Sequence, residues 1–226
     1  MDAFSAEIWQ SVALTVELAS VTTMILLVIG APLAWWLARS KTALREAVAA
    51  IITLLLVLPP TALGFCVLVL LGPSGPGGLL ASFWGERSLA FTFAGIVVGS
   101  VLSALPLVVQ PIRNAFAAMG DPPLEAAARV SPLYAFITIG LPLARLEFVK
   151  AAVIGFAHTI GTFGVVMMIG GNIPGRTKVL SAYVIDYVQA SRWREASVVA
   201  GGMVMFAFAV IFTLALLDRR CSRRST

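Results

Sequence analysis

Five long apolar runs dominate this sequence and limit the folds that it can adopt. A membrane-spanning helix needs about 20 consecutive, mainly apolar residues, and every run reaches that length. The runs cover residues 11–38, 47–71, 89–109, 141–169 and 196–217. The sequence therefore predicts an all-α membrane protein with five transmembrane helices, forming a single domain over residues 1–226.

The composition argues against a soluble protein. Of the 226 residues, 59% are hydrophobic and 12% are charged, whereas an average soluble domain has roughly 25% charged residues. So few charged side chains cannot cover a compact body in water. We therefore expect the lipid bilayer to surround most of the protein, and we expect no nucleic-acid partner.

Lysine and arginine are distributed unequally between the two sides of the predicted spans. Eleven lie on one side and five on the other, and the side with more positive charge is normally cytoplasmic. The eleven are Arg39, Lys41, Arg45, Arg113, Arg129, Arg145, Lys150, Arg219, Arg220, Arg223 and Arg224; the five are Arg87, Arg176, Lys178, Arg192 and Arg194. This bias predicts a multi-pass membrane protein with its N-terminus outside and its C-terminus inside.

The sequence offers little for catalysis. It contains no Walker A glycine loop, so ATP hydrolysis would need a partner. Its 11 acidic residues are scattered, and a single histidine excludes most zinc sites. We therefore expect no enzyme activity, no metal site and no cofactor in this chain.

One cytoplasmic segment, residues 120–142, is too polar and too rich in proline to span the membrane. Asp121 is a suitable N-cap, Pro122 fits the first helical position, and Glu125 favours the positive first turn. Ser131 then caps a second helix that begins at Pro132. The pattern predicts two short helices over about residues 121–140, and an amphipathic connector on the membrane surface is the simple alternative.

The same segment resembles a known motif. Glu125-Ala126-Ala127, followed by Ile139-Gly140-Leu141-Pro142, is similar to the EAA signature of binding-protein-dependent ABC importer permeases. Here 13 residues separate the triplet from Leu-Pro, where the family has 15, and Ser131 lies near the position of the family's glycine. The resemblance implies coupling helices that contact an ATPase subunit through Glu125, Ala126, Ala127, Arg129 and Ser131.

Other stretches resemble the molybdate branch of that family. They are Leu58-Pro59-Pro60-Thr61-Ala62-Leu63-Gly64, the glycine-rich loop at residues 72–78, and the two segments at residues 155–164 and 170–177. The family often has glutamate where this chain has Thr162. Together these stretches run from the first span to Thr177.

The resemblance implies the type I ABC importer permease fold, a location in the bacterial inner membrane, and a homodimer in which each copy supplies half of the pathway. Two ATPase subunits would bind ATP and magnesium, and an external substrate-binding protein would deliver molybdate. Transport would follow alternating access. The residues assigned to the pathway and its gate are Pro59, Pro60, Thr61, His158, Thr159, Thr162 and Asn172.

Structural alternatives remain open for these residues. Pro59 and Pro60 suit a simple kink, His158 suits a neutral hydrogen bond between helices, and Asn172 suits an external turn. Tungstate, sulfate and thiosulfate are alternative substrates, because they are also tetrahedral dianions. A secondary transporter or a membrane enzyme is less well supported, because neither internal repeats nor clustered acidic residues are found in the sequence.

Overall fold

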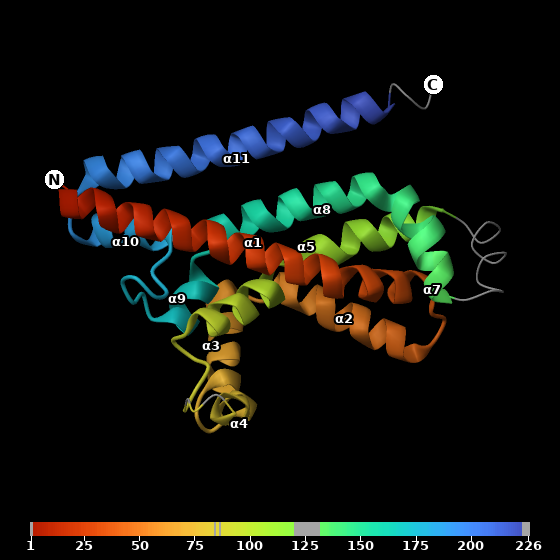
Figure 1. Cartoon of the computed structure of the whole chain (residues 1–226), viewed down its shortest axis with the longest axis horizontal. Helices are drawn as coiled ribbons and strands as arrows, with labels where there is room; N and C mark the ends of the chain where they lie inside the picture. The colour runs from red at the N-terminus through yellow and green to blue at the C-terminus, as the bar shows by residue number, and fades with distance from the viewer. Residues whose placement is uncertain (1, 84, 86, 120–131, 223–226) are drawn as a thin grey trace.

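Figure 1 shows the computed structural model, which describes residues 2–83, 85, 87–119 and 132–222. The described residues contain helices and no strand, so the predicted all-α class is confirmed. The helices are α1 (Asp2–Arg39), α2 (Ala43–Val57), α3 (Pro60–Leu71), α4 (Pro76–Ser82), α5 (Phe93–Ala118), α7 (Pro132–Ala135), the π-helical turn η1 (Phe136–Gly140), α8 (Leu141–Gly161), α9 (Gly164–Gly170), α10 (Leu180–Gln189) and α11 (Trp193–Ser222).

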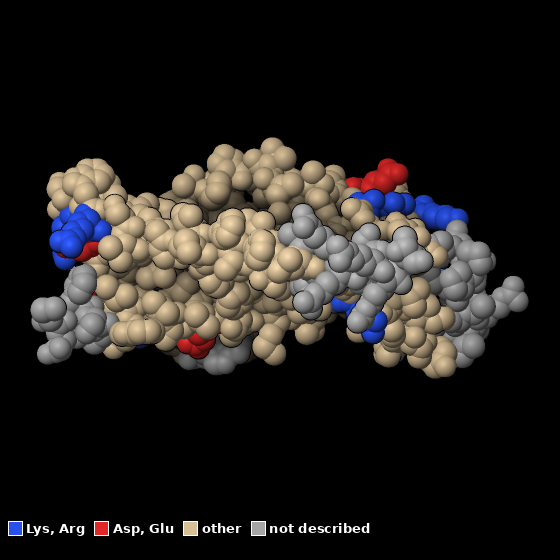
Figure 2. All heavy atoms as spheres, turned by 90° about the horizontal axis from the view of Figure 1, so that it is seen from above, with Lys and Arg blue, Asp and Glu red and all other residues tan. Residues whose placement is uncertain are grey.

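Helices α1, α5 and α8 form the centre of the molecule, and each packs against the other two. Figure 1 shows them running roughly along the long axis, with α11 along one side. The N-terminus, α10 and the start of α11 share one end of the molecule, and the C-terminus and α7 lie at the other. Side chains of the described Lys and Arg residues in the face shown in Figure 2 also lie toward the two ends. This arrangement leaves an apolar middle of the kind that a bilayer covers.

Two clusters of buried apolar side chains hold the bundle together. One joins α1, α3, α5 and α9, and the other joins α1, α2, α5 and α8. Small residues allow the helices to approach closely in the second cluster: a Cβ added to Gly155 of α8 would lie 2.9 Å from Cγ2 of Val108 on α5. Close backbone packing of this kind replaces the hydrophobic effect as the driving force between helices in lipid.

Three described helices, α1, α5 and α11, are long and apolar enough to cross a membrane unaided. The number rises to five if each of two bent pairs forms one span: α2 with α3, bent by 117°, and α8 with α9, bent by 60°. These five units overlap the five predicted apolar runs. The expected kink at Pro59 and Pro60 is thus a sharp break, and the second break was not predicted.

Some of the chain expected to be irregular is helical. The loop predicted at residues 72–78 gives way to α4 at Pro76, and the last external loop contains α10. Proline at the first helical position favours the start of α4, and buried Tyr183 and Tyr187 give α10 an apolar face.

Helix α8 begins at Leu141, with Pro142 in its first turn. In the structure, α7, η1 and α8 follow one another without a gap. The backbone N–H of Leu141 donates to the carbonyl of Phe136, five residues earlier. This wide π-helical turn accommodates Pro142, which cannot donate to an ordinary α-helical turn.

Candidate functional site

Both bent spans break inside an apolar run. Leu58 and Pro59, after α2, have ψ angles of 134° and 136°, and Thr162, after α8, has a ψ angle of 122°. These extended residues interrupt the helical hydrogen bonds, and Pro59 and Pro60 have no N–H to restore them. In a bilayer, non-helical backbone is stable only where it is buried in protein or faces water. The two breaks therefore mark a region that lipid does not cover.

The two breaks meet at a cavity of about 320 Å³, which we call the break cavity. Its lining combines both breaks with one turn of α5: Pro60, Ser103, His158, Gly161, Thr162, Phe163 and Gly164. A Cβ added to Gly164 would lie 3.1 Å from Cβ of Pro60, so the starts of α3 and α9 are in close contact. The cavity thus joins segments that lie far apart in the sequence.

A hydrogen bond crosses the wall of the break cavity. Ser103 Oγ on α5 and His158 Nε2 on α8 are 3.1 Å apart. The tautomer of the imidazole decides which atom donates, and in either case the bond orients the ring. The interhelical hydrogen bond that was the structural alternative for His158 is therefore present, and the same side chain also lines the cavity.

The two predicted threonines differ in position. Thr162 lines the break cavity, and its hydroxyl donates to the carbonyl of His158 at 2.7 Å. Thr159 is buried and donates to the carbonyl of Gly155 at 2.8 Å, and it is not among the lining residues. Both hydroxyls thus use their proton on the backbone of α8, so Thr162 can offer a ligand only its lone pairs.

Among the predicted pathway residues at the first break, Pro60 lines the cavity and Pro59 precedes it in the chain. Thr61 follows in the first turn of α3 and is exposed. Its Cγ2 would lie 3.6 Å from a Cβ added to Gly164. The structure therefore gathers these three residues near His158 and Thr162.

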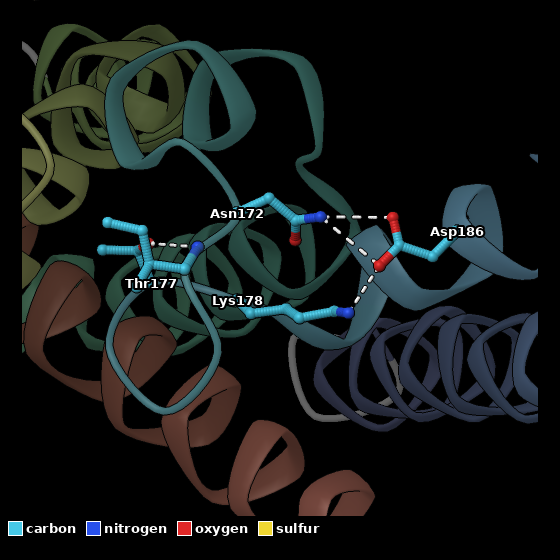
Figure 3. A network of polar contacts seen from close by, with 5 residues as sticks. Asn172, Thr177, Lys178 and Asp186 are labelled. Carbon is cyan, nitrogen blue, oxygen red and sulfur yellow. Dashed lines mark hydrogen bonds and ion pairs between the residues drawn. The ribbon is translucent and has the colours of Figure 1, made fainter.

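Asn172 lies in a different polar network, in the turn between α9 and α10 (Figure 3). Its Nδ2 donates to both carboxylate oxygens of Asp186, at 3.1 and 3.3 Å. Lys178 forms an ion pair with the same carboxylate at 2.5 Å and lies over the ring of Tyr183. Thr177 closes the turn by donating to the carbonyl of Gly170 at 2.6 Å. The arrangement fixes the α9–α10 turn on α10 and keeps Asn172 out of the break cavity.

A second, larger hollow of about 620 Å³ lies farther along α5 and α8, and we call it the inner groove. Its polar side chains include Gln110 and Asn114 of α5 and Glu147 of α8. Glu147 Oε1 accepts a hydrogen bond from Lys150 at 2.7 Å. Sequence reasoning missed Ser103, Gln110 and Asn114. Their spacing of seven and four residues, which places them on one helix face, was the available signal.

The predicted coupling residues Glu125, Ala126, Ala127, Arg129 and Ser131 lie outside the described residues. The chain that follows them is anchored by aromatic rings. Phe136 of η1 packs against Trp35 of α1 and Phe116 of α5, with ring centroids 5.5 and 6.1 Å apart. Trp35 and Phe116 are themselves 5.0 Å apart at 90°. This aromatic cluster connects η1 to two central helices, α1 and α5.

Within the described residues, no group of three or more His, Cys, Asp or Glu side chains is placed to hold a metal ion. The side chains that face the break cavity and the inner groove are mainly apolar or neutral and polar. They can form hydrogen bonds with a solute. Ser103 and His158 form one hydroxyl–imidazole pair, but no acidic residue lines the break cavity to orient the imidazole as a base.

The apolar spans and the two central breaks define a multi-pass membrane protein. Residues 30–222 match the family model described as "binding-protein-dependent transport system inner membrane component", and the chain belongs to this family. The resemblance noted in the sequence to binding-protein-dependent ABC importer permeases is therefore confirmed.

The chain is similar to two permeases of known systems. It is 53% identical over 206 residues to the molybdenum transport system permease protein ModB of Azotobacter vinelandii, an alignment that covers 90% of this chain and 91% of the relative. It is 32% identical over 184 residues to the molybdenum transport system permease protein ModB of Escherichia coli strain K12, covering 80% of each.

The fold is similar to that in the crystal structure of a bacterial alginate ABC transporter in complex with an alginate pentasaccharide-bound periplasmic protein. The TM-score is 0.70, with 18% sequence identity, and the alignment covers 94% of this chain and 78% of that chain. The predicted ABC importer permease fold is confirmed by this likeness.

Proposed function

We propose that this chain is the membrane-spanning subunit of an ATP-driven molybdate importer. The relation to the Azotobacter vinelandii permease, which extends over nearly the whole of both chains, is the observation that carries the choice of substrate. The break cavity and the inner groove supply the physical basis for a pathway. A binding protein delivers the oxyanion, and two copies of a separate ATPase provide the energy.

The pathway that we propose runs from the break cavity into the inner groove. On α5 their lining residues follow one face at positions 103, 107, 110 and 114, and on α8 they follow one face at positions 147, 154, 158 and 161. Steps of three, four and seven residues return to the same side of a helix. The two hollows are thus successive parts of one strip along α5 and α8.

The chemistry of this strip suits an oxyanion that must pass without being trapped. The Ser103–His158 pair, Gln110 and Asn114 offer hydrogen bonds without requiring a fixed positive charge. Glu147, near the inner end, pairs with Lys150. Neutral donors hold a dianion more weakly than lysine or arginine does, so tight selection is left to the binding protein.

A single copy leaves this strip open on one side. The exposed backbone of the first break is poorly suited to lipid, and a second copy facing it across a two-fold axis would cover it. In this homodimer the paired strips enclose the substrate route. The breaks act as the gate, because the segments on either side can change their relative angle without unwinding a long helix.

Coupling to the ATPase completes the proposed cycle. Glu125, Ala126 and Ala127 dock on the ATPase, with Arg129 and Ser131 at the same contact. Closure of the ATPase pair on ATP moves this segment. The aromatic cluster of Trp35, Phe116 and Phe136 passes the movement to α1 and α5. The access of the pathway then changes from one side of the membrane to the other.

The test is uptake into liposomes that contain the permease, its ATPase and its binding protein, with molybdate, tungstate and sulfate supplied in turn. We expect ATP-dependent uptake of molybdate and stimulation of ATP hydrolysis by the loaded binding protein. Uptake of sulfate alone would show that sulfate, and not molybdate, is the substrate. Uptake without ATP would contradict the ATP-driven mechanism.

One variant in the same assay tests whether the break cavity is part of the transport route. Gly161 lines the break cavity, and a Cβ added there meets no atom within 4 Å, so the side chain of Gly161→Leu has room to begin in the cavity. We expect this variant to lose at least about 90% of uptake while folding normally, because the leucine occupies the route. Gly201→Leu on α11 also enters open space and should keep wild-type uptake. Normal uptake by Gly161→Leu would exclude the break cavity from the route.

A further inference from the structure

Helix α11 leaves an apolar slot between itself and the rest of the bundle. Only 6% of its most apolar stretch is buried within the chain. The slot has a volume of about 320 Å³ and lies between one face of α1, formed by Ile8, Val12 and Val16, and one face of α11, formed by Val199, Met203 and Phe206. It is long, apolar and open to one side.

The lining of the slot has no side-chain polar group that needs a hydrogen bond from an occupant. Thr15 also lines it, but its hydroxyl donates to the carbonyl of Ser11 at 2.6 Å and accepts the N–H of Leu180 at 2.9 Å. The remaining lining is aliphatic or aromatic apart from Gly202. A chain of methylene groups fits such a surface, because only apolar contacts have to be made.

A second hollow, whose lining includes charged side chains, continues from one end of the slot. The two share Ile8, Val198 and Val199, and the hollow adds Arg194, Glu195 and Tyr187. Arg194 is exposed there, and the adjacent Trp193 is also exposed at the start of the span. Tryptophan and arginine at the end of an apolar helix are typical of the headgroup layer of a bilayer. This second hollow therefore lies at the depth of lipid headgroups.

The charge of this hollow suits an anion. Arg192 binds the Glu195 carboxylate through Nε and Nη2, at 3.1 and 2.9 Å, which offsets the negative charge. Arg194 is then the cation that faces the hollow. An apolar slot that ends at an arginine matches the shape and charge of a phospholipid with an anionic headgroup.

We propose that the slot between α1 and α11 is a binding site for one anionic membrane phospholipid, with an acyl chain between the helices and the phosphate at Arg194. The bound lipid fills the space that separates α11 from the bundle and fixes the helix in place. This site is independent of the transported substrate, since it shares no lining residue with the break cavity or the inner groove.

The site can be tested by native mass spectrometry of the purified, delipidated full-length permease. Phosphatidylglycerol and phosphatidylcholine with identical acyl chains are titrated separately. We expect one phosphatidylglycerol per chain to bind about fivefold more tightly than phosphatidylcholine, as one arginine near a lipid phosphate supports. Equal affinity for the two lipids would overturn the proposal.

Two pairs of variants separate the acyl and headgroup contacts. The new side chain of Gly202→Leu lies in the lining of the slot and should lower the affinity for both lipids by at least about tenfold. Gly201→Leu is also in open space but outside the slot lining, so this variant should bind both lipids like wild type. Arg194→Gln should abolish the preference for phosphatidylglycerol, and exposed Arg176→Gln should retain it.

Wild-type lipid binding by either Gly202→Leu or Arg194→Gln would refute the site. A change in dimerisation by Gly202→Leu with lipid binding intact would also refute it, because a second copy would then occupy the slot.

Discussion

Two serines on α5 show how one neighbour changes the role of a side chain. Ser103 shares a hydrogen bond with His158 and lines the break cavity. Ser100, one turn earlier, is buried, and its Oγ has no hydrogen-bond partner among the described residues. The first hydroxyl orients a ring in the proposed pathway, and the second is buried without a hydrogen-bond partner among the described residues.

Replacing these serines with alanine should therefore have different effects. Ser103→Ala removes the partner of His158 Nε2 at a cost of about 1 kcal/mol, and we expect uptake to fall by about fivefold. Ser100→Ala removes an unsatisfied buried hydroxyl, so uptake should be unchanged and stability equal or higher. Initial uptake rates and thermal unfolding of both variants check this. Equal uptake by the two variants would show that the bond to His158 has no role in transport.

The sequence drew attention to some residues of the two hollows and not to others. His158 stood out as an ionisable group in an apolar run, and the structure places it at the cavity. Gln110 and Asn114 did not stand out, because a neutral polar residue in a span gives no sign of which face it occupies until the neighbouring helix is known. The resemblance assigned Asn172 to the gate, and this assignment stays a prediction; in the structure the amide of Asn172 donates to Asp186.

At the scale of elements, the turn between α9 and α10 is held by charge. Lys178 and Asp186 are partly buried, with side chains 14% and 32% exposed, and their ion pair joins the turn to α10. Sequence analysis indicated no partner for Lys178, because Asp186 follows eight residues later across a turn whose course was unknown. In the structure the positive charge of Lys178 is paired with Asp186 of the same chain.

Lys178→Met should consequently destabilise the protein by about 1–2 kcal/mol, because it leaves a partly buried Asp186 without its cation. Arg176→Met, at an exposed position in the same turn, should change stability by no more than about 0.5 kcal/mol. Denaturant unfolding in detergent measures both. An equal loss in the two variants would assign the effect to general charge removal.

The breaks in the spans were only half predictable. The Pro59-Pro60 pair indicated the first break, since proline cannot continue helical hydrogen bonding. The second break, at Thr162 and Phe163, contains no proline and depends on the packing of α9 against α3. Tertiary contacts of this kind leave no local signal, although Gly161 and Gly164 on either side are weak helix formers.

At the scale of the whole molecule, the distribution of basic residues predicts the orientation in the membrane. The end of the molecule that carries α10 and the N-terminus belongs to the side with five basic residues. The end that carries the α1–α2 turn and the C-terminus belongs to the side with eleven. The positive-inside rule places the first end outside.

Labelling of single cysteines measures this orientation in a background with Cys66→Ser and Cys221→Ser. Gln189→Cys, exposed at the end of α10, should react with an impermeant maleimide in right-side-out vesicles. Thr42→Cys, exposed between α1 and α2, should react only after the membrane is opened. The reverse pattern would invert the topology and move the coupling segment away from a cytoplasmic ATPase.

The 117° bend between α2 and α3 sets an order of events during synthesis. Gly64 of α3 packs so closely on α9 that an added Cβ would lie 2.8 Å from Cβ of Met168. The ribosome makes α9 only after α5 and α8, so the second span enters the bilayer before the surface that holds its bend exists. Residues 47–71 are apolar enough to span the bilayer temporarily until α9 is made. The region proposed to open and close in the mature protein is therefore among the last parts of the nascent chain to reach its final shape.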